Sequence, residues 1–124
     1  MAKTGRPVSP HVTIYSFPVA ALSSITNRVT GVTLSFGALG LAAAEMTGPG
    51  SAAALMETIG SSGPLVAYSA KLAVAFPCTY HYLGAIRHLL WDRTPEMLTS
   101  MDVEKSSYAL AGASVVVTGG LMFV

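Results

Sequence analysis

Charged residues are missing from three long stretches of this chain, and their spacing is the strongest constraint on its fold. The seven Lys and Arg and the six Asp and Glu leave gaps at residues 29–44, 72–86 and 106–124. Charged residues make up only 10% of the 124 positions and hydrophobic residues 52%, whereas soluble domains carry roughly 25% charged residues. A domain this small has too little interior to hide so much apolar surface. An ordinary soluble domain is therefore not expected.

The three gaps predict helices. They are continuous, rich in Ala and Leu and without alternation, which favours helices over strands. A helix needs about 20 residues to cross a hydrocarbon core of about 30 Å, and flanking Lys and Arg extend its reach. We predict an all-α integral membrane protein with three transmembrane helices near residues 19–46, 64–91 and 106–124. Residues 51–59 are expected to form a short interfacial helix, and residues 1–124 a single membrane-anchor domain.

Basic residues beside these segments predict their orientation. Six of them lie near ends that would share one side of a membrane: Lys3, Arg6, Arg28, Arg87, Arg93 and Lys105. The positive-inside rule then puts the N-terminus inside and the C-terminus outside. Residues 1–18 contain three prolines and do not resemble a cleaved targeting peptide. We expect them to form an extended arm on the inner side.

Net charge and cysteine content exclude two further classes of protein. The net charge is +1, and the basic residues are scattered singly instead of forming a stripe, so nucleic-acid binding is not expected. Cys78 is the single cysteine, which excludes an intrachain disulfide, a CxxC motif and a c-type haem attachment site.

His81 is the ionisable residue that we expect deepest in the second predicted helix. Lys71 and Arg87 bracket that helix, which places His81 within about 3 Å of the bilayer centre at about 1.5 Å per residue. A neutral imidazole there could simply form a hydrogen bond to a neighbouring helix. It could instead bind a metal or haem iron, because imidazole is a common axial ligand.

Three basic groups favour the haem hypothesis. His88 follows His81 by seven residues, so it shares the same face about 10 Å nearer the inner surface. Haem propionates at that depth would need cations, and Arg28, Arg87 and His88 are expected there. Taken singly, the two arginines are also typical interfacial anchors. Their convergence with His88 makes haem binding the favoured interpretation.

A second axial ligand would have to come from another subunit. Two histidines on one helix face, about 10 Å apart, cannot bind opposite sides of one iron. His11 lies in the N-terminal arm, far from the predicted depth of His81. Pro77, one turn before His81, is expected to bend the helix because it removes one backbone hydrogen bond.

Small and polar side chains form a stripe on the first predicted helix. Ser24, Asn27, Arg28 and Gly31 follow the i, i+3, i+4, i+7 pattern of one helix face. Close helix packing explains part of such a stripe. A small polar ligand held by the Ser24 hydroxyl and the Arg28 guanidinium is the functional alternative, and a quinone with its two carbonyl oxygens fits.

Several motifs resemble the large cytochrome b anchor subunit of succinate dehydrogenase, respiratory complex II. The similarity covers nearly the whole chain and is strongest to mitochondrial and alphaproteobacterial members. The matching stretches are RPVSPHVTIY at residues 6–15, FP at 17–18, SITNRVTG at 24–31, YH at 80–81 and IRHLLWD at 86–92.

This resemblance implies a set of cofactors and partners. A b-type haem would be shared with a smaller membrane subunit that supplies the second histidine. A flavoprotein with FAD and an iron–sulfur protein would dock on the inner side of the bilayer and pass electrons from succinate to ubiquinone. Catalysis would belong to the complex, with no catalytic residue in this chain. The location would be the mitochondrial inner membrane or a bacterial plasma membrane.

The resemblance also implies residue roles. His81 matches the axial ligand of the haem iron, and Arg28 and His88 match propionate contacts. Ser24 and Arg28 match residues of the ubiquinone site, with Ile25 as its apolar wall.

Two positions depart from the family. Asn27 stands where most members have histidine, so it is given no role. Most members have a glycine four residues after the axial ligand. This chain has Ala85 at that position, and its Gly84 lies one residue earlier.

Two other classes of function remain open. In a small transmembrane proton-relay or transport subunit, His81 and Arg87 would relay protons, and the purified protein would carry no chromophore. A purely structural assembly subunit would use its histidines for packing and would bind neither haem nor quinone-site inhibitors.

Overall fold

The computed structural model describes residue 14 and residues 16–124 of the chain. Most of the predicted N-terminal arm, including His11, lies outside these residues. The described part is helical and contains no strand, so the all-α prediction is confirmed for it. Its elements in chain order are α1 (Val19–Glu45), α2 (Ser51–Ser61), α3 (Pro64–Arg93), the 3-10 helix η1 (Pro95–Met97) and α4 (Ser100–Leu121).

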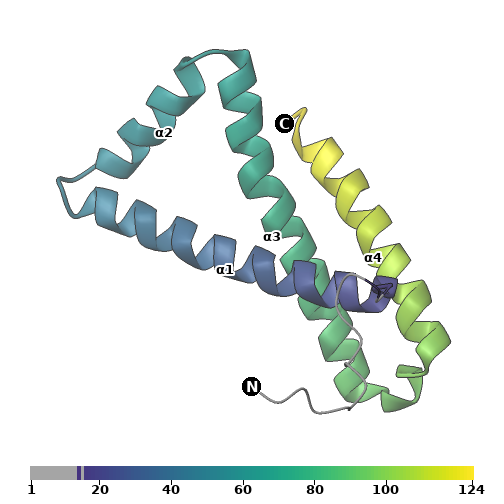
Figure 1. Ribbon diagram of the computed structural model, residues 1–124. Coiled ribbons are helices and arrows are strands. Elements are labelled where there is room, and N and C mark those ends of the chain that lie inside the picture. Colours follow the sequence, from purple (N-terminus) through teal and green to yellow (C-terminus); the bar gives the residue numbers. More distant parts are fainter. Residues whose placement is uncertain (1–13, 15) are drawn as a thin grey trace, which may run out of the picture.

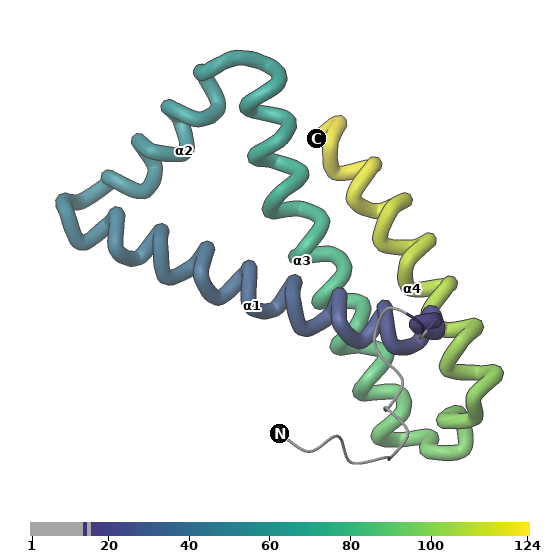
Figure 2. Tube along the Cα trace, viewed as in Figure 1, coloured from purple at the N-terminus to yellow at the C-terminus, as the bar shows by residue number. Residues whose placement is uncertain are grey.

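The helix α3 is the centre of the arrangement. It runs antiparallel to α4, and the N-terminal half of α1 crosses both helices near the turn that joins them (Figure 1). The other half of α1 diverges from α3, and α2 leads the chain back to the start of α3, closing a triangle (Figure 2). The region where α1, α3 and α4 meet therefore holds most of the contacts between distant parts of the sequence.

The prediction of three transmembrane helices is wrong for this structure. Among residues 14 and 16–124, every helix falls short of the combined length and apolarity that crossing a membrane requires. A stretch without charged residues is not necessarily apolar. Ser, Thr and Gly are interspersed through α1 and dilute its hydropathy, and α4 begins at Ser100, which brings Asp102, Glu104 and Lys105 into it. The predicted orientation, with the N-terminus inside and the C-terminus outside, depended on these spans and falls with them.

Local sequence explains where the helices begin. Pro64 occupies the first position of α3, where its missing N–H costs no helical hydrogen bond. The preceding Gly63 has φ of 120°, a conformation that side chains disfavour. Thr99 caps α4 by accepting a hydrogen bond from the Asp102 N–H. Pro77 lies inside α3, which continues through it to Arg93.

Small polar side chains dominate the packed interior. Tyr80 and Leu110 are the large hydrophobic residues that are buried in the described chain, whereas seven polar residues are buried: Ser23, Thr30, Thr79, Arg87, Ser107, Ser114 and Thr118. Several of these hydroxyls donate back to carbonyls of their own helix, as Ser114 does to Leu110 at 2.7 Å. Small residues with satisfied hydroxyls let helix backbones approach closely.

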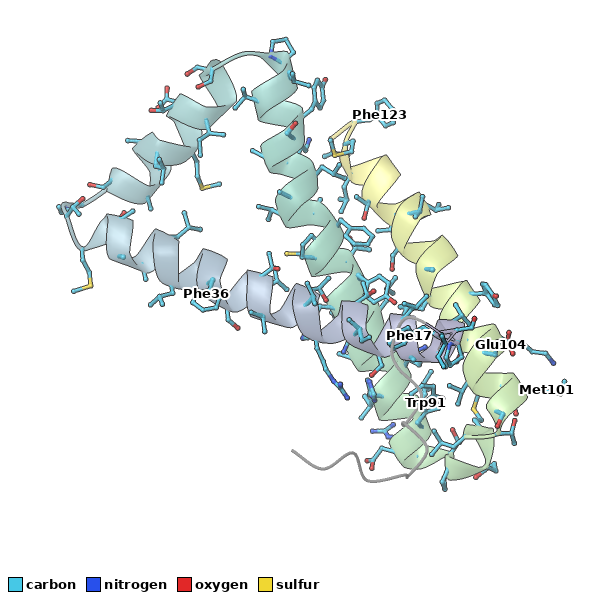
Figure 3. All side chains as sticks on the ribbon, viewed as in Figure 1. Phe17, Phe36, Trp91, Met101, Glu104 and Phe123 are labelled. Atoms are coloured by element: carbon cyan, nitrogen blue, oxygen red, sulfur yellow. The ribbon has the colours of Figure 1, made fainter. Side chains whose placement is uncertain are left out.

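Large apolar side chains lie mainly on the outside. Phe36 on α1 is 69% exposed, and Phe123 near the C-terminus is 93% exposed (both labelled in Figure 3). Polar and apolar side chains are therefore distributed in the opposite way to a soluble domain: hydroxyl groups lie between the helices, and large apolar side chains lie on the outside.

Glu45 links the end of α1 to the start of α2. Its carboxylate oxygens accept hydrogen bonds from the Gly50 N–H at 2.7 Å and the Ala52 N–H at 3.0 Å. These are N–H groups at the beginning of α2, which have no partner within the helix. The two bonds lower the pKa of Glu45 below its usual value of 4.5, since they favour the charged form.

This cap predicts a pH dependence confined to one helix end. The pKa of Glu45 is lower in the folded chain than in the unfolded chain. Its stabilisation of the start of α2 is therefore complete above the unfolded-state pKa and is lost as pH falls through the folded-state pKa. Amide-exchange protection of Gly50 and Ala52 should fall over that acidic range, while protection of Ala54, which bonds to the Gly50 carbonyl, falls less. Glu45→Gln should remove the difference in pH dependence between Ala54 and the other two amides. Equal pH profiles for all three amides in the unmodified chain would contradict the prediction.

Candidate functional site

His81 lies at the point where α3 crosses α1. Its Nδ1 is 3.0 Å from the main-chain carbonyl oxygen of Asn27. A carbonyl oxygen can only accept a hydrogen bond, so Nδ1 must carry the ring proton. The neutral ring then keeps its lone pair on Nε2, which is the arrangement found in metal-binding histidines.

Two glycines make this crossing close. A Cβ atom on Gly31 would lie 2.7 Å from Cε1 of His81, and one on Gly84 would lie 2.1 Å from Oδ1 of Asn27. Real Cβ atoms do not approach other atoms that closely. Each helix thus presents a glycine to a side chain of the other, and a larger residue at either position would force His81 or Asn27 to move.

A shallow groove runs along the exposed side of His81. Its lining is mostly apolar and is contributed by α3 with one residue each from α1 and α4: Leu34, Cys78, Thr79, His81, Tyr82, Leu83, Ala85 and Val117. The imidazole is therefore half-buried, with hydrocarbon on the open side and the Asn27 carbonyl on the other.

Arg87 joins three helices through its guanidinium group. Nη2 donates to the Ser23 hydroxyl of α1 and Nη1 to the Ser107 hydroxyl of α4, both at 3.0 Å. The Tyr80 hydroxyl also donates to Ser23 Oγ, at 3.0 Å. The Arg87 side chain is only 8% exposed, and its Nε has no hydrogen-bond partner among the described residues.

Trp91 stacks beside this cation near the C-terminal end of α3 (Figure 3). The guanidinium carbon of Arg87 lies 4.5 Å from the centre of its ring system, a cation–π distance. The His88 ring also contacts Trp91, nearly perpendicular to it, with ring centres 5.2 Å apart. His88 itself is exposed. Trp91 therefore contacts both a buried cation and an exposed imidazole.

The predicted polar stripe on α1 divides into two faces. Asn27 and Gly31 face α3, where they contact Gly84 and His81. Ser24 is half-buried and Arg28 exposed on the neighbouring face, and neither makes a hydrogen bond or ion pair with another residue of the described chain. Ile25 is 44% exposed beside them. Ser24, Ile25 and Arg28 therefore lie on a part of α1 that is half-buried at Ser24 and exposed at Ile25 and Arg28.

Sequence reasoning missed the buried cluster of Ser23, Tyr80, Arg87 and Ser107. It groups Arg87 with Arg28 and His88 as a cation for haem propionates, whereas the Arg87 guanidinium in the structure donates to hydroxyls of α1 and α4. One signal was present in the sequence. Ser23, Asn27 and Thr30 follow i, i+4 and i+7 spacing, which marks a second helix face.

The fold and the site define a helical protein: its described residues form helices only, and a half-buried imidazole is held by a main-chain carbonyl where two of these helices cross. A family model described as "Succinate dehydrogenase/Fumarate reductase transmembrane subunit" matches residues 2–121. The chain belongs to this family.

Individual relatives agree with this assignment. A mitochondrial succinate dehydrogenase cytochrome b560 subunit of Dictyostelium discoideum is 38% identical over 96% of this chain and 62% of its own length. The Homo sapiens counterpart is 40% identical over 72% of this chain and 54% of its own length. A succinate dehydrogenase cytochrome b556 subunit of Paracoccus denitrificans is 33% identical over 90% of this chain and 85% of its own length. The chain thus spans between half and two thirds of the first two relatives.

The Arg87 bridge generates a stability prediction. Arg87→Lys should lower the free energy of unfolding by roughly 2 kcal/mol, because a lysine cannot donate to two hydroxyls in a fork and stack on Trp91. Arg93→Lys is the matched control, since Arg93 is exposed at the end of α3, and should change stability by less than about 0.5 kcal/mol. Thermal unfolding of the purified chain measures both. Equal effects of the two substitutions would remove the bridge as a source of stability.

Proposed function

We propose that this chain is a cytochrome b membrane subunit of a succinate:ubiquinone oxidoreductase that holds a b-type haem and contributes to the ubiquinone site. The observation that carries the proposal is the hydrogen bond between His81 Nδ1 and the Asn27 carbonyl, which leaves Nε2 available as a ligand. Its location is a mitochondrial inner membrane or a bacterial plasma membrane, in keeping with a relative named as mitochondrial and another from Paracoccus denitrificans.

The residues around His81 fit a haem. The hydrogen bond at Nδ1 favours the tautomer with its lone pair on Nε2, and the groove beside the ring is lined mainly by hydrocarbon, which suits the apolar faces of a porphyrin. When bound, a b-type haem supplies a one-electron redox centre. His81 would be the axial ligand from this chain, and a histidine of a smaller membrane subunit would complete the coordination.

Arg28 and His88 would hold the propionates. Both side chains are exposed, and Arg28 has no ion-pair partner among residues 14 and 16–124. A carboxylate bound at Arg28 would be stabilised by charge-assisted hydrogen bonds, and the His88 ring would offer a further N–H donor. Arg87 is not proposed for this role, because its Nη1 and Nη2 are occupied by Ser107 and Ser23.

Ser24, Ile25 and Arg28 would form this chain's part of the ubiquinone site. The Ser24 hydroxyl would donate to a quinone carbonyl, Arg28 would orient the ring through its planar cation, and Ile25 would provide an apolar wall. Most hydroxyls of α1 donate to carbonyls one turn earlier, as Thr26 does to Leu22 at 2.9 Å. Ser24 makes no such bond within the described chain, so its proton is available to a ligand.

The remaining redox groups belong to partner subunits in this proposal. An iron–sulfur protein and a flavoprotein containing FAD would oxidise succinate and deliver electrons toward ubiquinone. This chain would bind and orient the haem and ubiquinone, without a catalytic residue of its own.

The haem ligand can be tested by spectroscopy. His81→Ala in the purified complex should abolish the b-type band in the reduced-minus-oxidised spectrum, because the chain would lose its iron ligand. His88→Ala should keep the band at lower intensity, since it removes one propionate contact only. An unchanged band in His81→Ala would exclude His81 as the ligand.

The quinone residues can be tested by comparing two activities of the complex. Arg28→Leu should lower ubiquinone reduction at least about tenfold, since a charged hydrogen bond contributes about 1.5–3 kcal/mol. Succinate oxidation by an artificial dye should persist. Arg93→Leu, which removes an exposed cation on α3, should leave both activities intact. Equal loss of both activities in Arg28→Leu would point to failed assembly and contradict the proposed role.

A further inference from the structure

The crossing of α1 and α3 contains a feature that the ligand role of His81 does not explain by itself. We propose that Asn27 is the positioning residue of His81. Its side chain, seated against Gly84, would fix the main-chain carbonyl that holds the imidazole. This inference rests on the proposed function, because positioning matters only if His81 is a ligand.

The Asn27 side chain is held by shape and not by hydrogen bonds. Its Oδ1 is buried and has no hydrogen-bond partner in the described chain. A Cβ atom on Gly84 would lie 2.1 Å from Oδ1 and 3.0 Å from Cγ. The amide therefore fills the space that the missing side chain of Gly84 leaves on α3. Burying an unpaired acceptor costs about 1–3 kcal/mol, and the close fit of the amide against Gly84 is the contact that offsets this cost.

The same residue carries the hydrogen bond to the ligand. The Asn27 carbonyl oxygen is 3.0 Å from His81 Nδ1, and the Thr30 hydroxyl also reaches it at 2.9 Å. Asn27 thus contacts α3 at two points, with its carbonyl at His81 and its amide at Gly84. A shift of about 1 Å between the helices would break the hydrogen bond, because bonds of this type end near 3.2 Å.

Loss of this hydrogen bond would change the ligand. An N–H···O=C bond on one ring nitrogen orients the imidazole and raises the basicity of the other nitrogen. Substituting such outer partners typically lowers metal affinity by 10- to 100-fold. Asn27 and Gly84 would therefore act on the haem iron through His81, without touching the haem.

The chain offers a size-exchange test. Gly84→Ala would force the Asn27 amide out of its seat, and Asn27→Ala would leave the seat empty. The double variant Asn27→Ala/Gly84→Ala places a methyl group where the amide was. Gly37→Ala is the matched control, because a Cβ atom there meets nothing within 4 Å. The complex carrying each variant is purified, and its haem content, optical spectrum and midpoint potential are measured together with its assembly by size exclusion.

We expect Gly84→Ala to lower haem affinity about tenfold and to raise the midpoint potential, since a less basic ligand stabilises ferric iron less. Asn27→Ala should shift the potential in the same direction with normal assembly, which keeps the test valid if Gly84→Ala fails to assemble. The double variant should lie closer to the unmodified complex than Gly84→Ala does. Gly37→Ala should match the unmodified complex.

Two results would overturn the inference. In the first, the single variants Gly84→Ala and Asn27→Ala have the same haem content, optical spectrum and midpoint potential as the control Gly37→Ala. In the second, the double variant loses as much haem affinity as Gly84→Ala does. Two residues that act through their mutual contact must instead show non-additive effects. Failure of the proposed function looks different. In that case His81→Ala keeps its haem, whereas failure of the inference alone leaves His81→Ala without haem and the Gly84 variant normal.

Discussion

The close approach of α1 to α3 is the constraint on which the rest of this structure depends. It is made at two glycines, with the His81 ring lying over Gly31 and the Asn27 amide over Gly84. Only at this separation can a main-chain carbonyl of α1 reach an imidazole nitrogen of α3. The orientation of the candidate ligand is therefore a property of the helix pair and not of His81 alone.

Hydroxyl groups complete the packing around this crossing. Ser107 and Ser114 are almost fully enclosed, at 1% and 0% exposure, and short side chains of this kind let α4 lie against its neighbours. Ser23 and Ser107 also accept hydrogen bonds from Arg87, which solvate its buried charge in place of water. The interior thus combines close packing with a polar network, and both depend on the same small residues.

Much of the fold follows from local sequence signals. Pro64 after a glycine and Pro18 before the apolar stretch mark helix starts, and the structure begins α3 at Pro64 and α1 at Val19. The membrane spans do not follow, because absence of charge is not apolarity and Ser and Thr recur through α1. α4 also starts earlier than the charge pattern predicts, since Asp102, Glu104 and Lys105 belong to the helix.

The sequence by itself determined the helical class, the family and the candidate ligand, because motif spacing and helix periodicity are local properties of the chain. Tertiary structure alone decided which face of α1 meets α3. Asn27 and Gly31 meet α3, whereas Arg28 is exposed and Ser24 half-buried, and Arg87 is buried against hydroxyls of two other helices. Neighbours on one helix differ by about 100° in direction, so only the position of a second helix settles which of them becomes interior.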